Sequence, residues 1–318
     1  MIKDKRYIVS SFYKYFALEN PEKALKEVRL WCSKNNILGR ILLAKEGISG
    51  AICGIDKNMK KFEAGLKKII DFDDLWFKHE PVKDQVYHKI VVRVKPEIIA
   101  FGAKVNVKNA GRHINPKELK RMLDSGKEVI MLDARNEKEY KVGRFKNALS
   151  LEIDLFKDFP KKINKIKDLK DKKIVMYCTG GIRCEKSSAY LKEQGFTDVN
   201  QIEGGIINYF NEVGGEHFEG GLYVFDDRIV ASVNSPISIC KFCSKPSDKY
   251  LDCFNLDCNK LFICCDSCRE KMFGCCSSLC LNAPRKKIGN NLERKEVLLK
   301  FISTIYFNAK RQFMRLTR

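Results

Sequence analysis

The residues best suited to chemistry lie in one short loop that combines a thiol, two glycines and a guanidinium. They are Cys178, Thr179, Gly180, Gly181, Ile182 and Arg183. The apolar run KIVMY at 173–177 predicts a buried strand before the loop, and the segment after it predicts a helix that begins near Cys184 or Glu185. The backbone N–H groups of such a loop point at the sulfur of its first residue. These surroundings lower a thiol pKa from ~8.5 into the range of roughly 3.5–7.5, so we expect Cys178 to be a nucleophilic thiolate.

The other loop residues are expected to serve that thiolate. The glycines allow a tight curve, and residues 179–182 form a cradle for an anion. Arg183 adds positive charge beside it. The next residue, Cys184, leaves two interpretations open, because it could resolve a disulfide or persulfide on the loop cysteine or simply occupy the first turn of the helix.

A second group of reactive residues follows, because ten of the 14 cysteines fall between Cys240 and Cys280. Clustered thiols in a chain without an export signal are more often metal ligands than disulfides. Four close pairs can supply two tetrahedral zinc sites, in sequential or interleaved pairing. The predicted ligands are Cys240, Cys243, Cys253, Cys258, Cys265, Cys268, Cys276 and Cys280. An iron–sulfur cluster is the alternative, but we expect structural zinc, which would order a segment poor in apolar residues.

The formal net charge of +20 indicates a polyanionic partner if the charge is localised. Part of it is localised, since residues 281–318 hold ten Lys or Arg against two Glu. We predict that Arg285, Lys286 and Lys287 contact RNA. An amphipathic helical stripe from Leu298 to Phe313 could bind RNA or a membrane surface, or dock on the protein itself.

The elements that must position these residues fall into three segments. The first, residues 1–100, has the order β-α-β-β-α-β, which is the ferredoxin-like arrangement. Asn20 and Pro21 begin its first helix as N-cap and first helical residue. A hairpin is predicted at 39–55 and a last strand at 88–99.

The second segment, residues 113–218, alternates apolar runs with helices and predicts a parallel α/β sheet. Seven lysines within 161–173 favour a solvated connector there. The third segment, residues 219–318, holds the cysteine cluster and the basic tail. No run approaches the ~18 apolar residues of a membrane span, and the N-terminus lacks the apolar stretch of a signal peptide. We therefore expect a cytoplasmic protein without a membrane partner.

The loop at 178–183 resembles the active-site loop of rhodanese domains, a six-residue ring that begins with the nucleophilic Cys and ends with Arg. The stretches LDAR at 132–135, EYKVGRFKNALSL at 139–151 and IEGGI at 202–206 are similar to the elements that flank it in that family. A six-residue loop in rhodanese relatives is associated with sulfur rather than phosphate chemistry. The resemblance therefore disfavours a phosphatase.

The whole arrangement resembles the bacterial tRNA uridine(34) hydroxylase family, with EGISG at 46–50, CTGGIRCEK at 178–186 and the cysteine cluster behind them. This resemblance implies hydroxylation of C5 of the wobble uridine in tRNA to 5-hydroxyuridine, with the loop cysteine required. It also implies molecular oxygen as co-substrate and tRNA rather than DNA as partner. The chain has no G-x-G-x-x-G signature, so no nucleotide cofactor is expected. Its four scattered histidines offer no obvious iron site of two His and one carboxylate.

Two other functions remain open. A persulfide-carrying sulfurtransferase, acting on thiosulfate or in tRNA thiolation, would use the same loop cysteine, whereas a non-catalytic RNA-binding adaptor would not need it. The intact Cys178 and Arg183 argue against the adaptor, and the extra domains argue against a simple small-molecule sulfurtransferase. We therefore expect an α/β multi-domain tRNA-modifying oxidoreductase. Its parts are a ferredoxin-like (acylphosphatase-like) N-terminal domain, a rhodanese α/β domain and a cysteine-rich zinc-binding C-terminal region.

Overall fold

The computed structural model of the protein describes residues 7–287. The chain falls into two compact units that divide between Ser238 and Ile239, and each is described by itself. The amphipathic stripe predicted from Leu298 to Phe313 lies outside the described residues. Within the described part of the chain, no helix has the length and apolar character needed to cross a bilayer.

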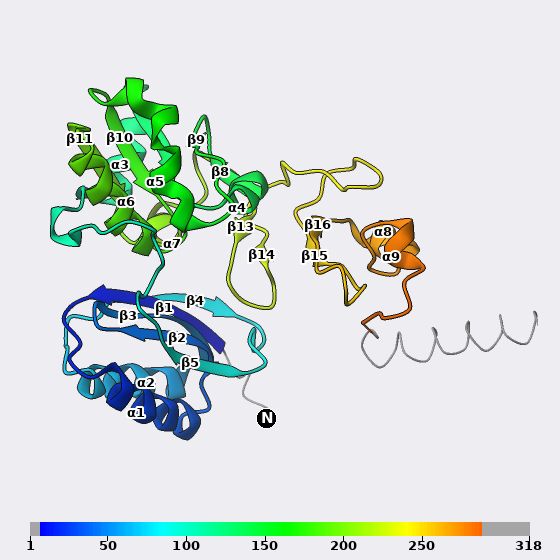
Figure 1. The fold of residues 1–318 in the computed structure, drawn as a ribbon, viewed down its shortest axis with the longest axis horizontal. Helices are drawn as coiled ribbons and strands as arrows, with labels where there is room; N and C mark the ends of the chain where they lie inside the picture. The colour runs from blue at the N-terminus through cyan, green and yellow to red at the C-terminus, as the bar shows by residue number, and fades with distance from the viewer. Residues whose placement is uncertain (1–6, 288–318) are drawn as a thin grey trace, which may run out of the picture. The chain divides into compact units, whose positions relative to one another are not determined.

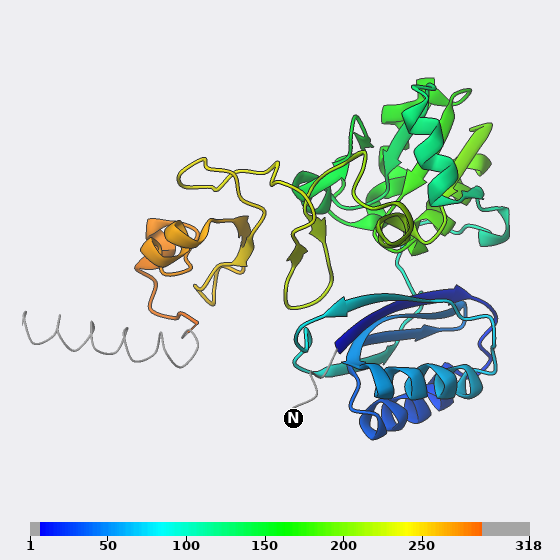
Figure 2. The same cartoon turned by 180° about the vertical axis from the view of Figure 1, so that it is seen from behind.

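The first unit begins with a five-stranded sheet, called here the N-terminal sheet, in the order β4-β1-β3-β2-β5. Its strands pair antiparallel, except that β2 and β5 are parallel. The elements are β1 (Tyr7–Tyr15), α1 (Pro21–Lys34), β2 (Leu38–Ala44), β3 (Gly47–Ile55), α2 (Asp56–Ile69), β4 (Phe77–Val82) and β5 (Ile90–Val94). Figure 1 shows both helices on one face of this sheet, and Figure 2 shows the same layer from behind. This is the predicted ferredoxin-like arrangement with one added edge strand.

The period of two in β1 explains how the two faces of the N-terminal sheet differ. Ile8 and Phe12 point to the helices and join a core with Val28 and Phe62. Tyr13 points to the opposite face, where its hydroxyl meets the other half of the first unit. One face of the N-terminal sheet therefore packs against its own helices, and the other face contacts the second half of the first unit.

Strand β4 does not follow from the sequence pattern, and its residues show why. Its sequence, FKHEPV, carries Lys, His, Glu and Pro, which is typical of an edge strand that must not pair further. It pairs with β1 alone. The strand predicted at 88–99 is shorter in the structure, where β5 covers Ile90–Val94.

The first unit continues with a second five-stranded sheet, called here the parallel sheet, in the order β6-β11-β10-β7-β9. All four neighbouring pairs are parallel, as predicted. Its strands are β6 (Arg112–Ile114), β7 (Ile130–Asp133), β9 (Leu149–Ser150), β10 (Lys173–Tyr177) and β11 (Asp198–Ile202). The associated α-helices are α3 (Pro116–Asp124), α4 (Glu137–Val142), α5 (Phe159–Lys162), α6 (Ile182–Glu193) and α7 (Gly205–Val213). Three short 3₁₀ helices join them, η1 (Val107–Asn109), η2 (Phe156–Asp158) and η3 (Ile163–Leu169).

Strand β10 lies at the centre of the parallel sheet and is buried on both faces. Ile174 and Met176 enter one hydrophobic core, and Val175 and Tyr177 enter the other. In open parallel sheets, ligand sites gather beyond the carboxyl ends of the strands. The residue that follows β10, Cys178, stands at this end.

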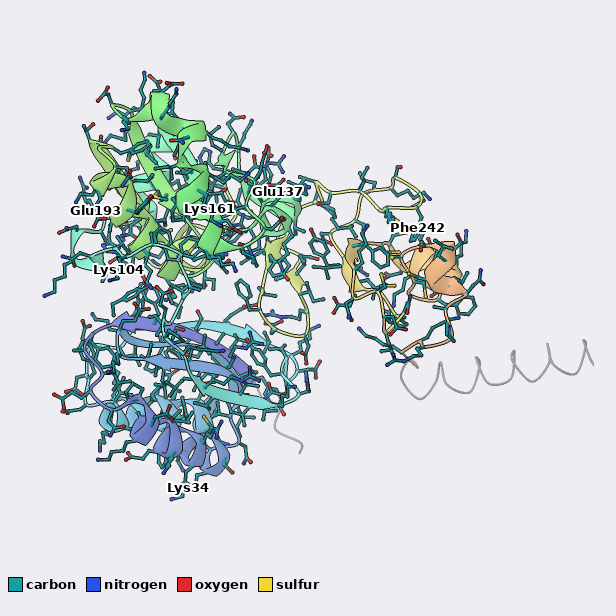
Figure 3. All side chains as sticks on the ribbon, viewed as in Figure 1. Lys34, Lys104, Glu137, Lys161, Glu193 and Phe242 are labelled. Atoms are coloured by element: carbon teal, nitrogen blue, oxygen red, sulfur yellow. The ribbon has the colours of Figure 1, made fainter. Side chains whose placement is uncertain are left out.

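The lysine-rich stretch at 161–173 is more ordered than a connector. It contains the end of α5 and all of η3, and Ile166 is buried in the core while all seven lysines are exposed. Lys161, labelled in Figure 3, pairs with Asp158 at 2.9 Å. The lysines are therefore solvated, as expected, but the backbone between them packs.

Two short antiparallel pairs complete the first unit. They are β8 (Gly143–Phe145) with β12 (Phe218–Gly220), and β13 (Leu222–Tyr223) with β14 (Val230–Ala231). The hairpin of β13 and β14 reaches the N-terminal sheet, where the Arg228 guanidinium pairs with Glu80 of β4. The Asp227 N–H also donates to Val86 O at 3.0 Å. By their contacts, residues 219–238 lie in the first unit, although the sequence pattern predicts one region of 219–318 that includes them with the cysteines.

The second unit, described from Ile239 to Lys287 and called here the cysteine-rich unit, has few regular elements. They are β15 (Tyr250–Asp252), β16 (Leu261–Ile263), α8 (Asp266–Lys271) and α9 (Ser278–Leu281). Its buried core consists of seven cysteines and Phe262, and the Phe242 ring packs edge-on against Phe262 with a ring-centroid distance of 6.0 Å. Phe242 is labelled in Figure 3. So small an apolar core does not order a chain by burial alone.

Candidate active site

The Cys178 loop, residues 178–183, turns from β10 into α6 around a glycine with left-handed backbone. Gly181 has a φ of +98° and forms the N-cap of α6, so the helix begins at Ile182, earlier than predicted. Gly205 closes the turn from the other side, because a Cβ there would lie 2.5 Å from Cys178 O. These two glycines allow the loop to curl around the sulfur.

The Cys178 side chain is completely buried at the start of this loop. The Gly181 N–H donates to its sulfur at 3.1 Å. Burial alone would raise the pKa of the Cys178 thiol, but the Cys184 thiol, the Arg183 charge and the N–H groups of both residues outweigh burial. Together they lower this pKa from 9.0 to about 5. The loop therefore holds Cys178 as a thiolate at neutral pH, while its role as a nucleophile stays a prediction.

Cys184 lies in the first turn of α6 and is as deeply buried as Cys178. Burial and its hydrogen bond to the Cys178 thiolate raise the pKa of the Cys184 thiol well above the usual value. Cys184 therefore stays protonated and donates its S–H to the neighbouring sulfur. It sits both in the helical turn and beside the reactive sulfur, so both interpretations of it remain open.

The Arg183 guanidinium is buried and has its own counter-ion. Its Nη1 lies 3.0 Å from Glu139 Oε1, and its Nη2 lies 2.6 Å from Glu139 Oε2 and 3.3 Å from Thr179 Oγ1. Glu139 comes from α4 and is fully buried. Sequence reasoning missed this partner, although Glu139 begins the EYKV stretch that resembles a rhodanese flank. Glu139 is therefore the counter-ion of Arg183, and the Arg183 charge still lowers the pKa of Cys178.

A cavity of about 540 Å³ opens against the Cys178 loop. The loop forms one wall, the N-terminal sheet contributes Ser11, Tyr13 and Lys78, and the hairpin of β13 and β14 contributes Phe225. Phe225 is 57% exposed, and the Arg183 guanidinium carbon lies 5.7 Å from the centroid of its ring. The volume is in the range of small-molecule sites. Sequence reasoning found only the loop wall, because the other walls come from segments far away in the chain.

Helix α6 holds the N-terminal sheet against the loop through polar groups. The Tyr13 hydroxyl donates to Glu185 Oε1 at 2.9 Å. The Lys186 ammonium, which is buried, lies 2.9 Å from Glu46 Oε1 and 2.8 Å from Glu97 Oε1. The two residues of α6 after Cys184 therefore tie the reactive loop to the first hundred residues of the chain.

The cysteine-rich unit brings the eight predicted metal ligands into two groups of four. One group is Cys240, Cys243, Cys265 and Cys268, and the other is Cys253, Cys258, Cys276 and Cys280. The pairing is therefore interleaved, and Cys264 and Cys275 belong to neither group. Three sulfur–sulfur distances within the groups are 3.6–3.7 Å. Four thiolates ~2.3 Å from one tetrahedral ion stand about 3.8 Å apart, so each group fits a single zinc ion better than a cluster of several irons.

The three basic residues predicted to contact RNA are all exposed in the cysteine-rich unit. Arg285 pairs with Asp257 at 2.8 Å, and Lys286 Nζ donates to Leu281 O. The Lys287 N–H donates to a carbonyl of the same unit. The backbone here is thus anchored and the charges face solvent, while RNA contact stays a prediction.

The four histidines are separate from one another. Their carboxylate partners are Glu63 for His79, Asp227 for His88, Glu185 for His113 and Asp124 for His217. Among residues 7–287, one exposed group that could hold a metal includes a histidine, namely Asp124, Glu216 and His217. It contains one imidazole, so the pair of histidines that an iron site of this type needs is not assembled by the described residues.

Three family models match along the chain. The model described as "UPF0176 acylphosphatase like domain" matches residues 7–98, "Rhodanese-like domain" matches 115–212 and "Rhodanase C-terminal" matches 219–281. Together with the cysteine groups, these matches confirm the predicted fold class. Among solved structures, a rhodanese-like domain protein from Staphylococcus aureus is 28% identical, with a TM-score of 0.27 and coverage of 34% of this chain and 96% of that chain.

Curated relatives match over most of the chain. The tRNA uridine(34) hydroxylase of Cytophaga hutchinsonii is 43% identical over 289 residues, which cover 89% of this chain and 92% of the relative. The tRNA uridine(34) hydroxylase of Chlamydia muridarum is 36% identical over 291 residues, which cover 89% and 88%. Identity of this level over nearly the full length of both proteins shows that the chain belongs to the tRNA uridine(34) hydroxylase family.

Proposed function

We propose that this chain hydroxylates C5 of the wobble uridine, uridine 34, in tRNA, with Cys178 as the catalytic nucleophile. The observation that carries the proposal is a thiolate at the wall of a 540 Å³ cavity, in a chain whose relatives are named for this reaction. A nucleobase with its ribose fits a cavity of this size. The wobble base lies in a single-stranded loop, so it leaves its stack at little cost.

The thiolate supports covalent catalysis. Its sulfur adds to C6 of the uracil, which makes C5 an enolate-like nucleophile able to capture oxygen. The Gly181 N–H, 3.1 Å from the sulfur, stabilises the thiolate before the attack. Because Cys178 has no exposed area, entry of the base requires the cavity wall to move.

Molecular oxygen is the oxidant in this proposal, and a thiol is the reductant. Uridine, O₂ and two thiols give 5-hydroxyuridine, water and one disulfide, so the two electrons come from the thiols. One oxygen atom enters the base and the other leaves as water. This balance makes the source of the new hydroxyl oxygen measurable.

The cysteine-rich unit supports a structural role for zinc, which we propose for both groups of four. We expect two zinc ions per chain by elemental analysis of the purified protein. Cys258→Ser, inside a group, should lower the zinc content to about one, whereas Cys275→Ser, outside both groups, should keep two. Iron in place of zinc, or equal metal loss in the two variants, would reject the proposal.

Nucleoside mass spectrometry tests the function. tRNA would be compared between a strain that lacks the gene and the same strain complemented with the wild-type chain, grown under ¹⁸O₂. We expect 5-hydroxyuridine derivatives to disappear on deletion and to return with one ¹⁸O atom. Loss of thiolated nucleosides instead would reject hydroxylation in favour of the persulfide-carrying sulfurtransferase. Unlabelled 5-hydroxyuridine would reject O₂ as the oxygen donor.

A further inference from the structure

Lys78 is a buried lysine in the cavity that also contains Cys178. It lies on the edge strand β4, opposite Ser11 of β1, and only 4% of the residue is exposed. Its side chain approaches the Cys178 loop, because a Cβ built on Gly180 would lie 3.9 Å from Lys78 Cε. Lys78 and Cys178 line the same cavity from two different sheets.

The surroundings of the Lys78 ammonium are aromatic rather than acidic. Its Nζ lies 5.0 Å from the ring centroid of Tyr13 and 4.8 Å from that of Trp76. Cation–π contact offsets part of the cost of burying the charge. The ring faces, however, are not oxygen or nitrogen acceptors for the N–H groups of the ammonium. The three N–H bonds of this group are therefore available to a ligand in the cavity.

Glu185 attracts Lys78 electrostatically, but its carboxylate oxygens form hydrogen bonds with other side chains. Its Oε1 accepts from the Tyr13 hydroxyl and lies 2.9 Å from His113 Nε2. Its Oε2 accepts from Gln201 Nε2 at 3.2 Å. Glu185 is therefore a structural anchor between the two sheets and not the counter-ion of Lys78.

The other buried cations of the first unit differ from Lys78 in having carboxylate partners. Arg183 is bound by both oxygens of Glu139, and Arg135 is bound by Asp133. Each of these pairs is close to neutral and fixed in orientation. Among the described residues that line the cavity, Lys78 is the buried cation without a carboxylate partner.

Such a lysine is costly for the fold. Burial lowers the pKa of Lys78 to about 8, while the charges of Cys178 and Glu185 oppose this shift. The ammonium is thus still the main form at neutral pH, although a buried and unpaired charge destabilises the folded chain. A cation without a hydrogen-bonded carboxylate, already attracted by the Cys178 thiolate, is suited to an anion that forms in the cavity when that sulfur reacts.

We propose that Lys78 is a catalytic residue whose ammonium donates a hydrogen bond to O4 of the target uracil. The proposal rests on the proposed function. When the Cys178 sulfur bonds to C6, the C5–C6 π electrons move between C4 and C5, and the C4–O4 π electrons move onto O4. The negative charge leaves the sulfur and arrives at O4, where Lys78 stabilises it. The reverse step breaks the S–C6 bond and restores the thiolate, so neither direction consumes an oxidant or a reductant.

This addition has a signature that does not require oxygen. While the charge is on O4, C5 accepts a proton from solvent, and reversal of the addition then exchanges the hydrogen at C5. The assay uses tRNA with deuterium at C5 of uridine 34, full-length protein and anaerobic buffer, and measures loss of the label by mass spectrometry. Wild type should exchange the label, and Cys178→Ser should not.

The decisive variant is Lys78→Met, which keeps the length of the side chain and removes the charge. It should slow the exchange by about 100-fold, as loss of one charge-stabilising donor typically does. Lys78→Arg should restore part of the rate because it restores a cation. Lys60→Met is the matched control, since Lys60 is an exposed lysine of α2 paired with Asp56, and it should exchange at the wild-type rate.

Two further readouts separate a catalytic role from a structural one. Lys78→Met should unfold at the same or a higher temperature, because it no longer buries an unpaired charge. The pH midpoint for alkylation of Cys178 should move up only slightly, because Cys184 and Arg183 are the main groups that lower this pKa and the Lys78 charge adds a smaller attraction. A lower unfolding temperature together with a midpoint near 9 would make Lys78 structural and overturn the proposal.

The outcomes also distinguish the two proposals from each other. If wild type hydroxylates uridine 34 but Lys78→Met exchanges at the wild-type rate, the assignment of Lys78 is wrong and the function stands. If wild type hydroxylates without any exchange, the addition step is wrong and the assignment of Lys78 is wrong with it. If wild type neither exchanges nor hydroxylates, the proposed function itself is wrong.

Discussion

Glu139 and Arg183 form a bidentate ion pair, with N–O distances of 3.0 and 2.6 Å, that is shielded from water beside the Cys178 loop. Arg183 ends the loop, and Glu139 comes from α4, 44 positions earlier in the chain. The geometry around the thiolate therefore depends on a residue outside the loop. Removing either Glu139 or Arg183 would leave the other buried charge unpaired and destabilise the fold.

Replacing Glu139 by Gln should destabilise the fold strongly. The variant leaves the Arg183 guanidinium buried without a counter-ion, which costs about 3–5 kcal/mol in comparable sites. Urea unfolding measures this loss. The control is Glu137→Gln on the same helix, where the carboxylate lies 3.6 Å from the exposed Lys141 and the expected loss is below about 1 kcal/mol. Equal losses in the two variants would contradict the account of the buried pair.

The reactivity of Cys178 should follow a titration far below that of an ordinary thiol. Its pKa is lowered from 9.0 to about 5, so iodoacetamide alkylation should reach a plateau above pH 6 and fall below pH 5. Peptide mass spectrometry can follow Cys178 separately from the other cysteines. A midpoint near 9 would show that the loop does not hold a thiolate.

The same shift predicts how stability depends on pH. Because the folded pKa of Cys178 lies below its ordinary value, ionisation stabilises the folded chain. This contribution is complete above pH 9 and is lost as the pH falls through about 5. The free energy of unfolding of wild type, measured relative to Cys178→Ser, should therefore rise from pH 5 to pH 9. A difference that stays constant over this range would contradict the prediction.

Cys184 should lower the pKa of the Cys178 thiol rather than act as the nucleophile itself. Cys184→Ser keeps a donor beside the Cys178 sulfur and should have a mild effect on hydroxylation, whereas Cys184→Ala removes the donor. A hydrogen bond to a charged group contributes about 1.5–3 kcal/mol, so the pKa of Cys178 should rise by about 1–2 units in Cys184→Ala. If Cys184→Ser abolishes hydroxylation as Cys178→Ser does, a disulfide or persulfide relay becomes the better mechanism.

The basic residues of the cysteine-rich unit should contribute to tRNA affinity without selecting the base. We expect replacement of Arg285, Lys286 and Lys287 by Ala to weaken binding to all tRNAs alike. The log–log salt slope should flatten by roughly 0.7–0.9 for each lost phosphate contact, up to about three contacts. The Arg285 pair with Asp257 is exposed, so a phosphate can take the place of the carboxylate. Salt titrations with two tRNAs check this prediction. An unchanged slope would show that these three residues do not contact tRNA phosphates, and the lysines at 161–173 would be the next candidates.

The parts of this protein that follow from its sequence are the local ones. The Cys178 loop and the eight metal-ligand cysteines are recognisable because each motif spans a few neighbouring residues. Glu139, Lys78 and Tyr13 are not recognisable in this way, because they reach the site only when separate elements pack together. The charged sequence of β4 conceals a strand whose Lys78 side chain faces the reactive loop. The interleaved pairing of the cysteines likewise required the fold, since sequential pairing satisfies the same spacing.

The central claim is that the Cys178 sulfur carries out the hydroxylation of uridine 34. The most direct test is nucleoside mass spectrometry of tRNA from cells whose only copy of the gene encodes Cys178→Ser. The account predicts that 5-hydroxyuridine and its derivatives are absent, while the variant protein remains folded and binds tRNA with nearly wild-type affinity. Normal levels of 5-hydroxyuridine in these cells would contradict it.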